Sequence, residues 1–141
     1  MARFVLLYHD CPPHYERRSH WDFMLEADSS LRTWSIEQLP RDWQQAYSLT
    51  SGKYPHCPAL SKDNSVSAEQ LADHRLEYLE IEGPLSDDRG MVSRIDRGSY
   101  RGDTTLQNCW RIVLAGAVCS GEATLRQNDS VEWILTVRTT D

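Results

Sequence analysis

The chain of 141 residues contains no apolar run close to the roughly 20 residues that a membrane-spanning helix needs. Its first apolar stretch is short and ends at His9 and Asp10, whereas a signal peptide carries about 7–15 apolar residues followed by small ones. We therefore expect a cytoplasmic protein with no membrane association. Since this length suits a single hydrophobic core, we also expect one domain spanning residues 1–141.

An excess of positive charge is also missing. The 15 Lys and Arg stand against 21 Asp and Glu, which gives a net charge of −6. Proteins that coat nucleic acid without regard to sequence draw on a basic surface, so this charge argues against that class. An enzyme that acts on a nucleic-acid end needs only a local basic patch and stays compatible with the composition.

None of the four cysteines forms a Cys-x-x-Cys pair, so neither a zinc ribbon nor a redox motif is indicated. Without an export signal, disulfides are not expected either. The sequence therefore predicts reduced, mostly buried thiols at Cys11, Cys57, Cys109 and Cys119.

Helical patterning is scarce. Only residues 67–72 carry a capping pattern, which predicts one or two helical turns, and residues 53–64, with two prolines, predict a loop. Seven short runs instead alternate apolar and polar residues between turn signals, as half-buried strands do. Such a set predicts a mostly β sandwich or barrel, and a closed or nearly closed barrel of about seven to eight strands would remove exposed edges. The runs are residues 4–8, 21–27, 31–36, 75–81, 91–95, 109–115 and 131–138.

The segment 20–26 is predicted to be a strand with two very different faces. Its odd-numbered residues are Trp, Phe and Leu, which predict the core face. His20 and Asp22 share the other face with Cα atoms about 6.5–7 Å apart, a workable span for two ligands of one cation. A set of imidazole and carboxylate ligands suits Mn, Fe or Zn better than Ca or Mg.

A third ligand would complete such a site. His9 follows the first predicted strand, His14 lies in the connection to the second, and His74 lies farther along the chain. Because loops supply ligands as readily as strands do, spacing alone does not choose among the three.

Six short motifs follow one another in order over most of the chain. They are Phe4-Val5-x-x-x-His9-Asp10, His20-Trp21-Asp22-Phe23-x-Leu25-Glu26, Leu31-Arg32-Thr33-Trp34, Asp73-His74-Arg75-Leu76-Glu77-Tyr78, Glu82-Gly83 and Asp96-Arg97-Gly98-Ser99-Tyr100. This series resembles the 3′-phosphoesterase domain of bacterial DNA ligase D. The resemblance implies a single closed β-barrel domain that removes 3′-phosphate or 3′-ribonucleotide from DNA or RNA ends.

The implied cofactor is Mn²⁺ or another divalent transition ion such as Zn²⁺, and the implied partners are the nucleic-acid end and a ligase or polymerase acting in trans. Carried over residue by residue, the metal ligands are His9, His20 and Asp22. In the family the first histidine stands six residues before the second, a spacing that His14 has. His9 fits the strand context better and requires a loop insertion, so His14 is the alternative.

The resemblance places a catalytic histidine and tyrosine near the phosphate at His74 and Tyr78. Three cationic positions of the family are absent, because they fall at Met24, Gln38 and Val66.

Arg17 and Arg18 are the residues that we expect to contact the substrate phosphate in their place. The alternative function is a catalytically impaired relative that keeps the metal site and binds a nucleic-acid end or another phosphorylated ligand.

Overall fold

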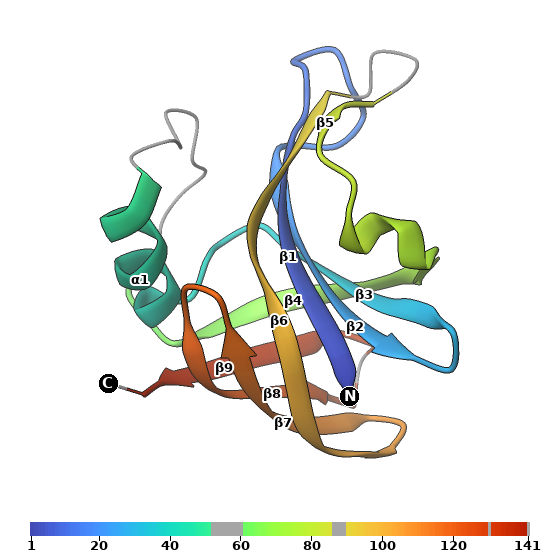
Figure 1. Cartoon of the computed structure of the whole chain (residues 1–141), viewed down its shortest axis with the longest axis vertical. Helices are drawn as coiled ribbons and strands as arrows, with labels where there is room; N and C mark the ends of the chain where they lie inside the picture. Colours follow the sequence, from blue (N-terminus) through green and yellow to red (C-terminus); the bar gives the residue numbers. More distant parts are fainter. Residues whose placement is uncertain (52–60, 86–89, 130, 141) are drawn as a thin grey trace.

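The computed structural model describes residues 1–51, 61–85, 90–129 and 131–140. In these residues the chain forms nine strands, one α-helix and one 3₁₀ helix (Figure 1). The elements are β1 (Ala2–Asp10), β2 (His20–Ala27), β3 (Ser30–Ile36), α1 (Arg41–Ser51), β4 (Ser65–His74), η1 (Leu76–Leu79), β5 (Gly83–Pro84), β6 (Met91–Leu106), β7 (Cys109–Gly116), β8 (Ser120–Gln127) and β9 (Trp133–Thr139).

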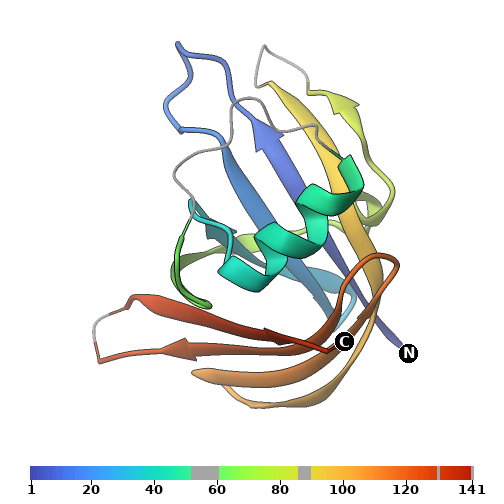
Figure 2. The same ribbon diagram turned by 90° about the vertical axis from the view of Figure 1, so that its left-hand side faces the viewer.

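Eight of these strands close into an antiparallel barrel. Their order is β1-β2-β3-β4-β9-β8-β7-β6, and β6 returns to pair with β1. Strand β5 lies outside the barrel and pairs only with the start of β6. Figures 1 and 2 show the strands curving around a common interior, with α1 lying beside them. The prediction of a closed, mostly β barrel of seven to eight strands is confirmed.

Alternation along the strands fills the interior with large apolar side chains. Phe4, Leu6 and Tyr8 of β1 and the odd-numbered residues of β2 face inward and belong to one buried cluster. Trp34 lies at the centre, with its ring edge-on to Trp110 and to Trp133 at centroid distances of 5.3 and 5.4 Å. These aromatic contacts hold opposite walls of the barrel together.

A second apolar cluster covers the outer face of β1 and β2. Val5, Leu7 and Met24 point away from the barrel interior and pack against Leu79 of η1. The strands are therefore buried on both faces, which explains why β2 is apolar at Met24 as well as at its inward positions.

Two predicted elements are wrong. Residues 67–72 belong to strand β4 rather than a helix, because their backbone pairs with β3 and β9 and tertiary pairing overrides a weak local preference. Residues 75–81 contain the 3₁₀ helix η1 rather than a strand, because Leu79 packs onto the outer cluster.

Helix α1 and strand β8 were not predicted. The signal for α1 is Trp43 and Tyr47, four residues apart and both buried in the barrel core. Of the predicted loop, residues 61–64 lead irregularly into β4, and residues 53–60 lie outside the described residues. None of the helices that the structure describes is long and apolar enough to cross a membrane.

Candidate metal and phosphate site

His9 and His20 face each other at the ends of β1 and β2. They are direct partners in the antiparallel register, and their ring centroids lie 5.0 Å apart. Their neighbours Tyr8 and Trp21 point into the barrel, so alternation turns both imidazoles to the outer face. The structure thus brings together two histidines that are eleven positions apart in the sequence.

Asp22 completes the contact from within β2. Its Oδ1 lies 3.3 Å from His20 Nε2, and both atoms are buried without a hydrogen-bond partner. The Nδ1 of His20 lies 2.8 Å from the carbonyl oxygen of Arg18. A carbonyl can only accept, so Nδ1 carries a proton, and in the neutral ring Nε2 then presents a lone pair. Two lone pairs therefore face each other in a buried position, which fits a bound cation.

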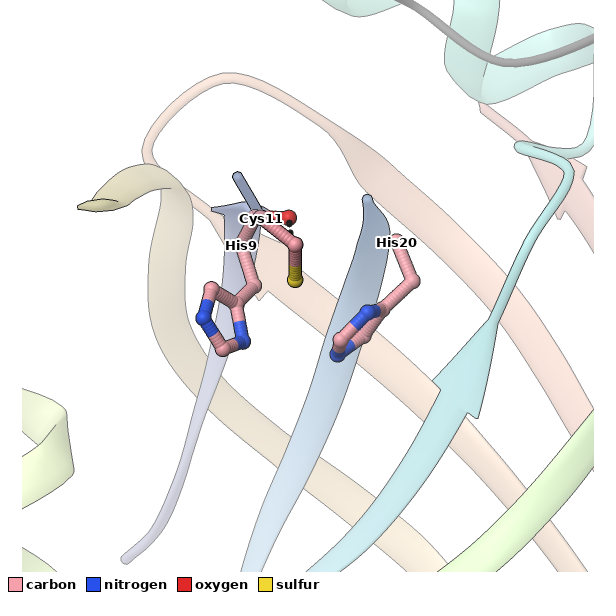
Figure 3. Close-up of side chains that lie close together, drawn as sticks. All are labelled: His9, Cys11 and His20. Carbon is pink, nitrogen blue, oxygen red and sulfur yellow. Dashed lines mark hydrogen bonds between the residues drawn. The ribbon is translucent and has the colours of Figure 1, made fainter. Parts of the chain in front are cut away.

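Cys11 joins this site, which the sequence had not indicated. His9, Cys11 and His20 offer ligand atoms that all lie within 4.8 Å of one another, and the Cys11 thiol lies between the two rings in Figure 3. Burial raises the pKa of this thiol, against the opposite effect of the nearby Arg17 guanidinium. The signal in the sequence was the position of Cys11 two residues after His9.

The remaining predicted cysteines and His14 lie elsewhere. Cys119 is buried and Cys109 half-buried, both with free thiols as Cys11 has, and Cys57 lies outside the described residues. His14 is exposed in the connection between β1 and β2 and is not part of the group. The structure therefore brings His9, and not His14, to His20.

A groove of about 890 Å³ opens beside His20 and is also lined by Arg17, Arg18 and Ser35. Ser35 lies opposite Asp22 on β3, and Arg17 Nη2 donates a 2.9 Å hydrogen bond to its hydroxyl oxygen. Within the described part of the chain neither arginine forms an ion pair. Four glutamates on the same lining outnumber these two cations: Glu16, Glu37, Glu69 and Glu132.

A family model for the DNA ligase D 3′-phosphoesterase domain matches residues 12–127, most of the chain. The chain belongs to this family. The match contains Arg17, Arg18, His20 and Asp22 and begins just after His9 and Cys11. A search of curated proteins found no match. Membership supports a 3′-phosphoesterase-like function.

The family's missing cationic positions have distinct surroundings in this 3′-phosphoesterase-like barrel. Met24 is 1% exposed beneath the outer apolar cluster, and Val66 faces the barrel interior. Gln38 is exposed and lines the groove beside His20. A charge at residue 24 or 66 would be buried, so the packing of this barrel disfavours a cation at either position.

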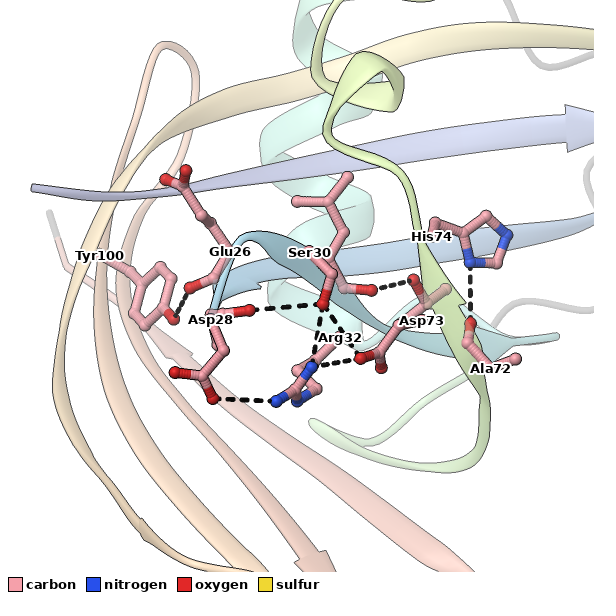
Figure 4. A network of polar contacts seen from close by, with 11 residues as sticks. Glu26, Asp28, Ser30, Arg32, Ala72, Asp73, His74 and Tyr100 are labelled. Carbon is pink, nitrogen blue, oxygen red and sulfur yellow. Dashed lines mark hydrogen bonds and ion pairs between the residues drawn. The ribbon is translucent and has the colours of Figure 1, made fainter.

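Two further arginines of the described residues are engaged by carboxylates elsewhere. Arg32 forms ion pairs with Asp28 and Asp73 and also donates to Ser30 (Figure 4). Arg94 lies against Glu82 at 3.5 Å. With these guanidinium groups engaged, Arg17 and Arg18 are the arginines that line the groove beside His20.

His74 and Tyr78 form a separate pair. Their rings lie 5.1 Å apart, and His74 Nδ1 donates to the carbonyl of Ala72 (Figure 4). On β3, Leu31 pairs with His74 while Ser35 pairs with Asp22. Leu31 and Ser35 are four residues, or about 13 Å, apart along β3. Because β3 also lies between β2 and β4, His74 and Asp22 are separated by two further strand spacings of about 5 Å each. His74 is therefore not among the residues that the structure brings together with His9 and His20.

Proposed function

We propose that this domain is a metal-dependent phosphoesterase that removes 3′-phosphate or 3′-ribonucleotide from DNA or RNA ends. The observation that carries the proposal is the buried pair of acceptors, His20 Nε2 and Asp22 Oδ1, facing each other at 3.3 Å. A protein interior tolerates such a pair when a cation or proton lies between its members. Family membership supports the phosphoesterase activity itself.

His9, His20 and Asp22 would hold the ion, Mn²⁺ or another divalent transition ion such as Zn²⁺. When bound, that ion would polarise a phosphoryl oxygen and acidify a water molecule at neutral pH. The chain's own contribution is orientation. The Arg18 carbonyl fixes the His20 ring, and the antiparallel register holds His9 opposite it.

Arg17 and Arg18 would bind the phosphate. The guanidinium of Arg17 uses one nitrogen on Ser35, which leaves further N–H groups for phosphate oxygens. The negative charges of the four glutamates along the groove would repel a long polyanion that lay across it. We therefore propose that the substrate enters as a chain end, with His74 and Tyr78 placed for its more distant nucleotides.

The alternative, a relative that binds such ends without cleaving them, rests on the absent cations at Met24, Gln38 and Val66. Arg17 and Arg18 beside His20 offset that absence. The proposal includes a ligase or polymerase that acts in trans on the trimmed end. It also includes a cytoplasmic location, where free thiols such as Cys11 and Cys119 persist.

The test is phosphate release from a single-stranded oligonucleotide that carries a 3′-phosphate, with Mn²⁺ or Zn²⁺ present. We expect turnover by the wild type and none by Asp22→Asn. The matched control is Asp63→Asn, which changes an exposed aspartate in the segment before β4 and should leave turnover unchanged. The same oligonucleotide phosphorylated at its 5′ end should release nothing. No turnover by folded wild-type protein with either ion would contradict the proposal.

A further inference from the structure

We infer that Cys11 is a fourth protein donor of the metal site and gives it a preference for a thiophilic ion such as Zn²⁺ over Mn²⁺. The inference deepens the proposed function, since it concerns the same site. It changes the chemistry of that site, because a thiolate joins two imidazoles and a carboxylate.

The position of Cys11 follows from the backbone. β1 ends at Asp10, and the next residue, Cys11, donates a 3.0 Å hydrogen bond from its N–H to Ser19 Oγ. This bond ties the two ends of the connection between β1 and β2 together. As a result the thiol is held between His9 and His20, with one ligand atom from each of the three residues within 4.8 Å of the other two (Figure 3).

A pair of buried acceptor atoms also points to a cation at this place. His20 is 1% exposed and Asp22 is 7% exposed, and the acceptor atoms that they turn toward each other lack hydrogen-bond partners. The donors of a tetrahedral zinc site lie about 3.3–3.8 Å apart, given bond lengths of about 2.0–2.3 Å. The 3.3 Å contact meets this spacing, and small side-chain rotations would bring in the thiol.

The donor set decides which ion is preferred. Thiolate ligands select zinc and similar soft or borderline ions, whereas Mn²⁺ favours carboxylate, carbonyl and water oxygens. A site with His9, His20 and Asp22 alone would accept either ion. With Cys11 added, four protein ligands match the number that zinc takes in its tetrahedral sites.

The decisive measurement is Co²⁺ titration, because cobalt replaces zinc and reports its ligands by absorption. We expect a sulfur-to-cobalt charge-transfer band in the near ultraviolet that saturates at one ion per chain. Cys11→Ser should lose this band and keep the visible bands of cobalt bound to the remaining ligands. Cys109→Ser, a half-buried thiol on β7, and Cys57→Ser are the controls and should retain it.

Affinity provides a second readout. Competition with a chelating dye should show that Cys11→Ser lowers the ratio of Zn²⁺ to Mn²⁺ affinity by about tenfold or more, which corresponds to ~1.4 kcal/mol. If Cys11→Ser fails to fold, the test is alkylation of the wild-type protein with and without Zn²⁺. Zn²⁺ should then protect Cys11 from iodoacetamide and leave Cys109 unprotected, as read by peptide mass spectrometry.

A wild type that binds Co²⁺ without the charge-transfer band, or a band that persists in Cys11→Ser, overturns the inference. So does equal protection of the two thiols. These outcomes are separable from the activity. Phosphate release without the charge-transfer band would support the proposed function and overturn the role of Cys11. The band without phosphate release under any ion would support the role of Cys11 and overturn the proposed function.

Discussion

Two buried aspartates of the same barrel, Asp96 on β6 and Asp22 on β2, differ in what surrounds their charge. Asp96 is 3% exposed and Asp22 7% exposed. The oxygens of Asp96 accept four hydrogen bonds at 2.8–3.1 Å, from the Tyr47 hydroxyl and the backbone N–H groups of Arg97, Val118 and Cys119. Asp22 instead turns an oxygen toward the lone pair of His20. A buried carboxylate is thus either satisfied by the protein or available for a ligand.

Asp96 is enclosed so tightly that nothing else can enter. A Cβ added at Gly116 would lie 2.5 Å from its Oδ2, so only glycine fits beside it. Burial, followed by the charge of Asp96, raises the pKa of Tyr47 far above its ordinary value, so the hydroxyl stays protonated and donates. Through its four hydrogen bonds the carboxylate of Asp96 joins helix α1 to β6 and to the turn between β7 and β8.

The largest expected effect is on the enclosed carboxylate. Asp96→Ala leaves several buried donors without an acceptor, each worth about 1–3 kcal/mol, so we expect the free energy of unfolding to fall by roughly 4 kcal/mol or more. Urea unfolding in the presence of EDTA measures this loss for the metal-free protein. Asp22→Asn is the matched comparison and should change the metal-free stability by less than about 1 kcal/mol, because it removes a facing pair of acceptors. Equal losses of stability in Asp96→Ala and Asp22→Asn would contradict the difference that we draw between the two carboxylates.

Metal addition should stabilise the protein only where the carboxylate of Asp22 is present. At an ion concentration 100 times the dissociation constant, the wild type should gain about 2.7 kcal/mol of stability. Asp22→Asn should gain much less stability at the same ion concentration, because the loss of a ligand weakens binding of the ion. Thermal unfolding with and without Zn²⁺ checks this, with Asp63→Asn as the control. A full gain in Asp22→Asn would show that the ion binds elsewhere.

A smaller effect is expected at Tyr47. Tyr47→Phe keeps the ring in the core and removes one hydrogen bond to a charged group, which predicts a loss of about 1.5–3 kcal/mol. Stabilisation by metal should remain intact, because Asp96 lies outside the metal cluster. Urea unfolding with and without Zn²⁺ separates the two quantities. A Tyr47→Phe variant that no longer responds to metal would mean that the two sites are coupled.

The smallest effect concerns a partly exposed carboxylate, that of Glu26. Hydrogen bonds from Arg3 hold the pKa of Glu26 below its ordinary value. A lowered folded-state pKa means that this pair stabilises the fold above the ordinary glutamate pKa and ceases to do so as the pH falls through the folded-state value. Glu26→Gln should therefore narrow the difference in stability between pH 7 and pH 3, and added salt should narrow it in the wild type. A salt-independent difference would contradict the pairing.

Part of the candidate site could be predicted from the chain alone. The alternation of β2 placed His20 and Asp22 on one face because successive strand residues point to opposite sides. Resemblance to the family supplied His9, and the register of β1 with β2 places it beside His20. Cys11 was not predicted, although it stands two residues after His9, because only the pairing of β1 with β2 brings His20 close to both residues.

Other elements depended on contacts between distant segments. The sequence pattern favoured helix at residues 67–72, and pairing with β3 and β9 made them strand. Arg32 could have served a phosphate by residue type, but Asp28 and Asp73 engage it in the folded chain. Neither outcome is encoded in the local sequence.

By itself, the sequence determined the β character of the chain, the inward face of β2 and the shared face of His20 and Asp22. These follow from a period of two, which is a property of one extended segment. The tertiary structure decided the closure of β6 onto β1, the choice of His9 over His14 as neighbour of His20, and the contrast between Asp22 and Asp96. Those depend on register and on which donors reach a buried charge, and both arise only when separate segments pack together.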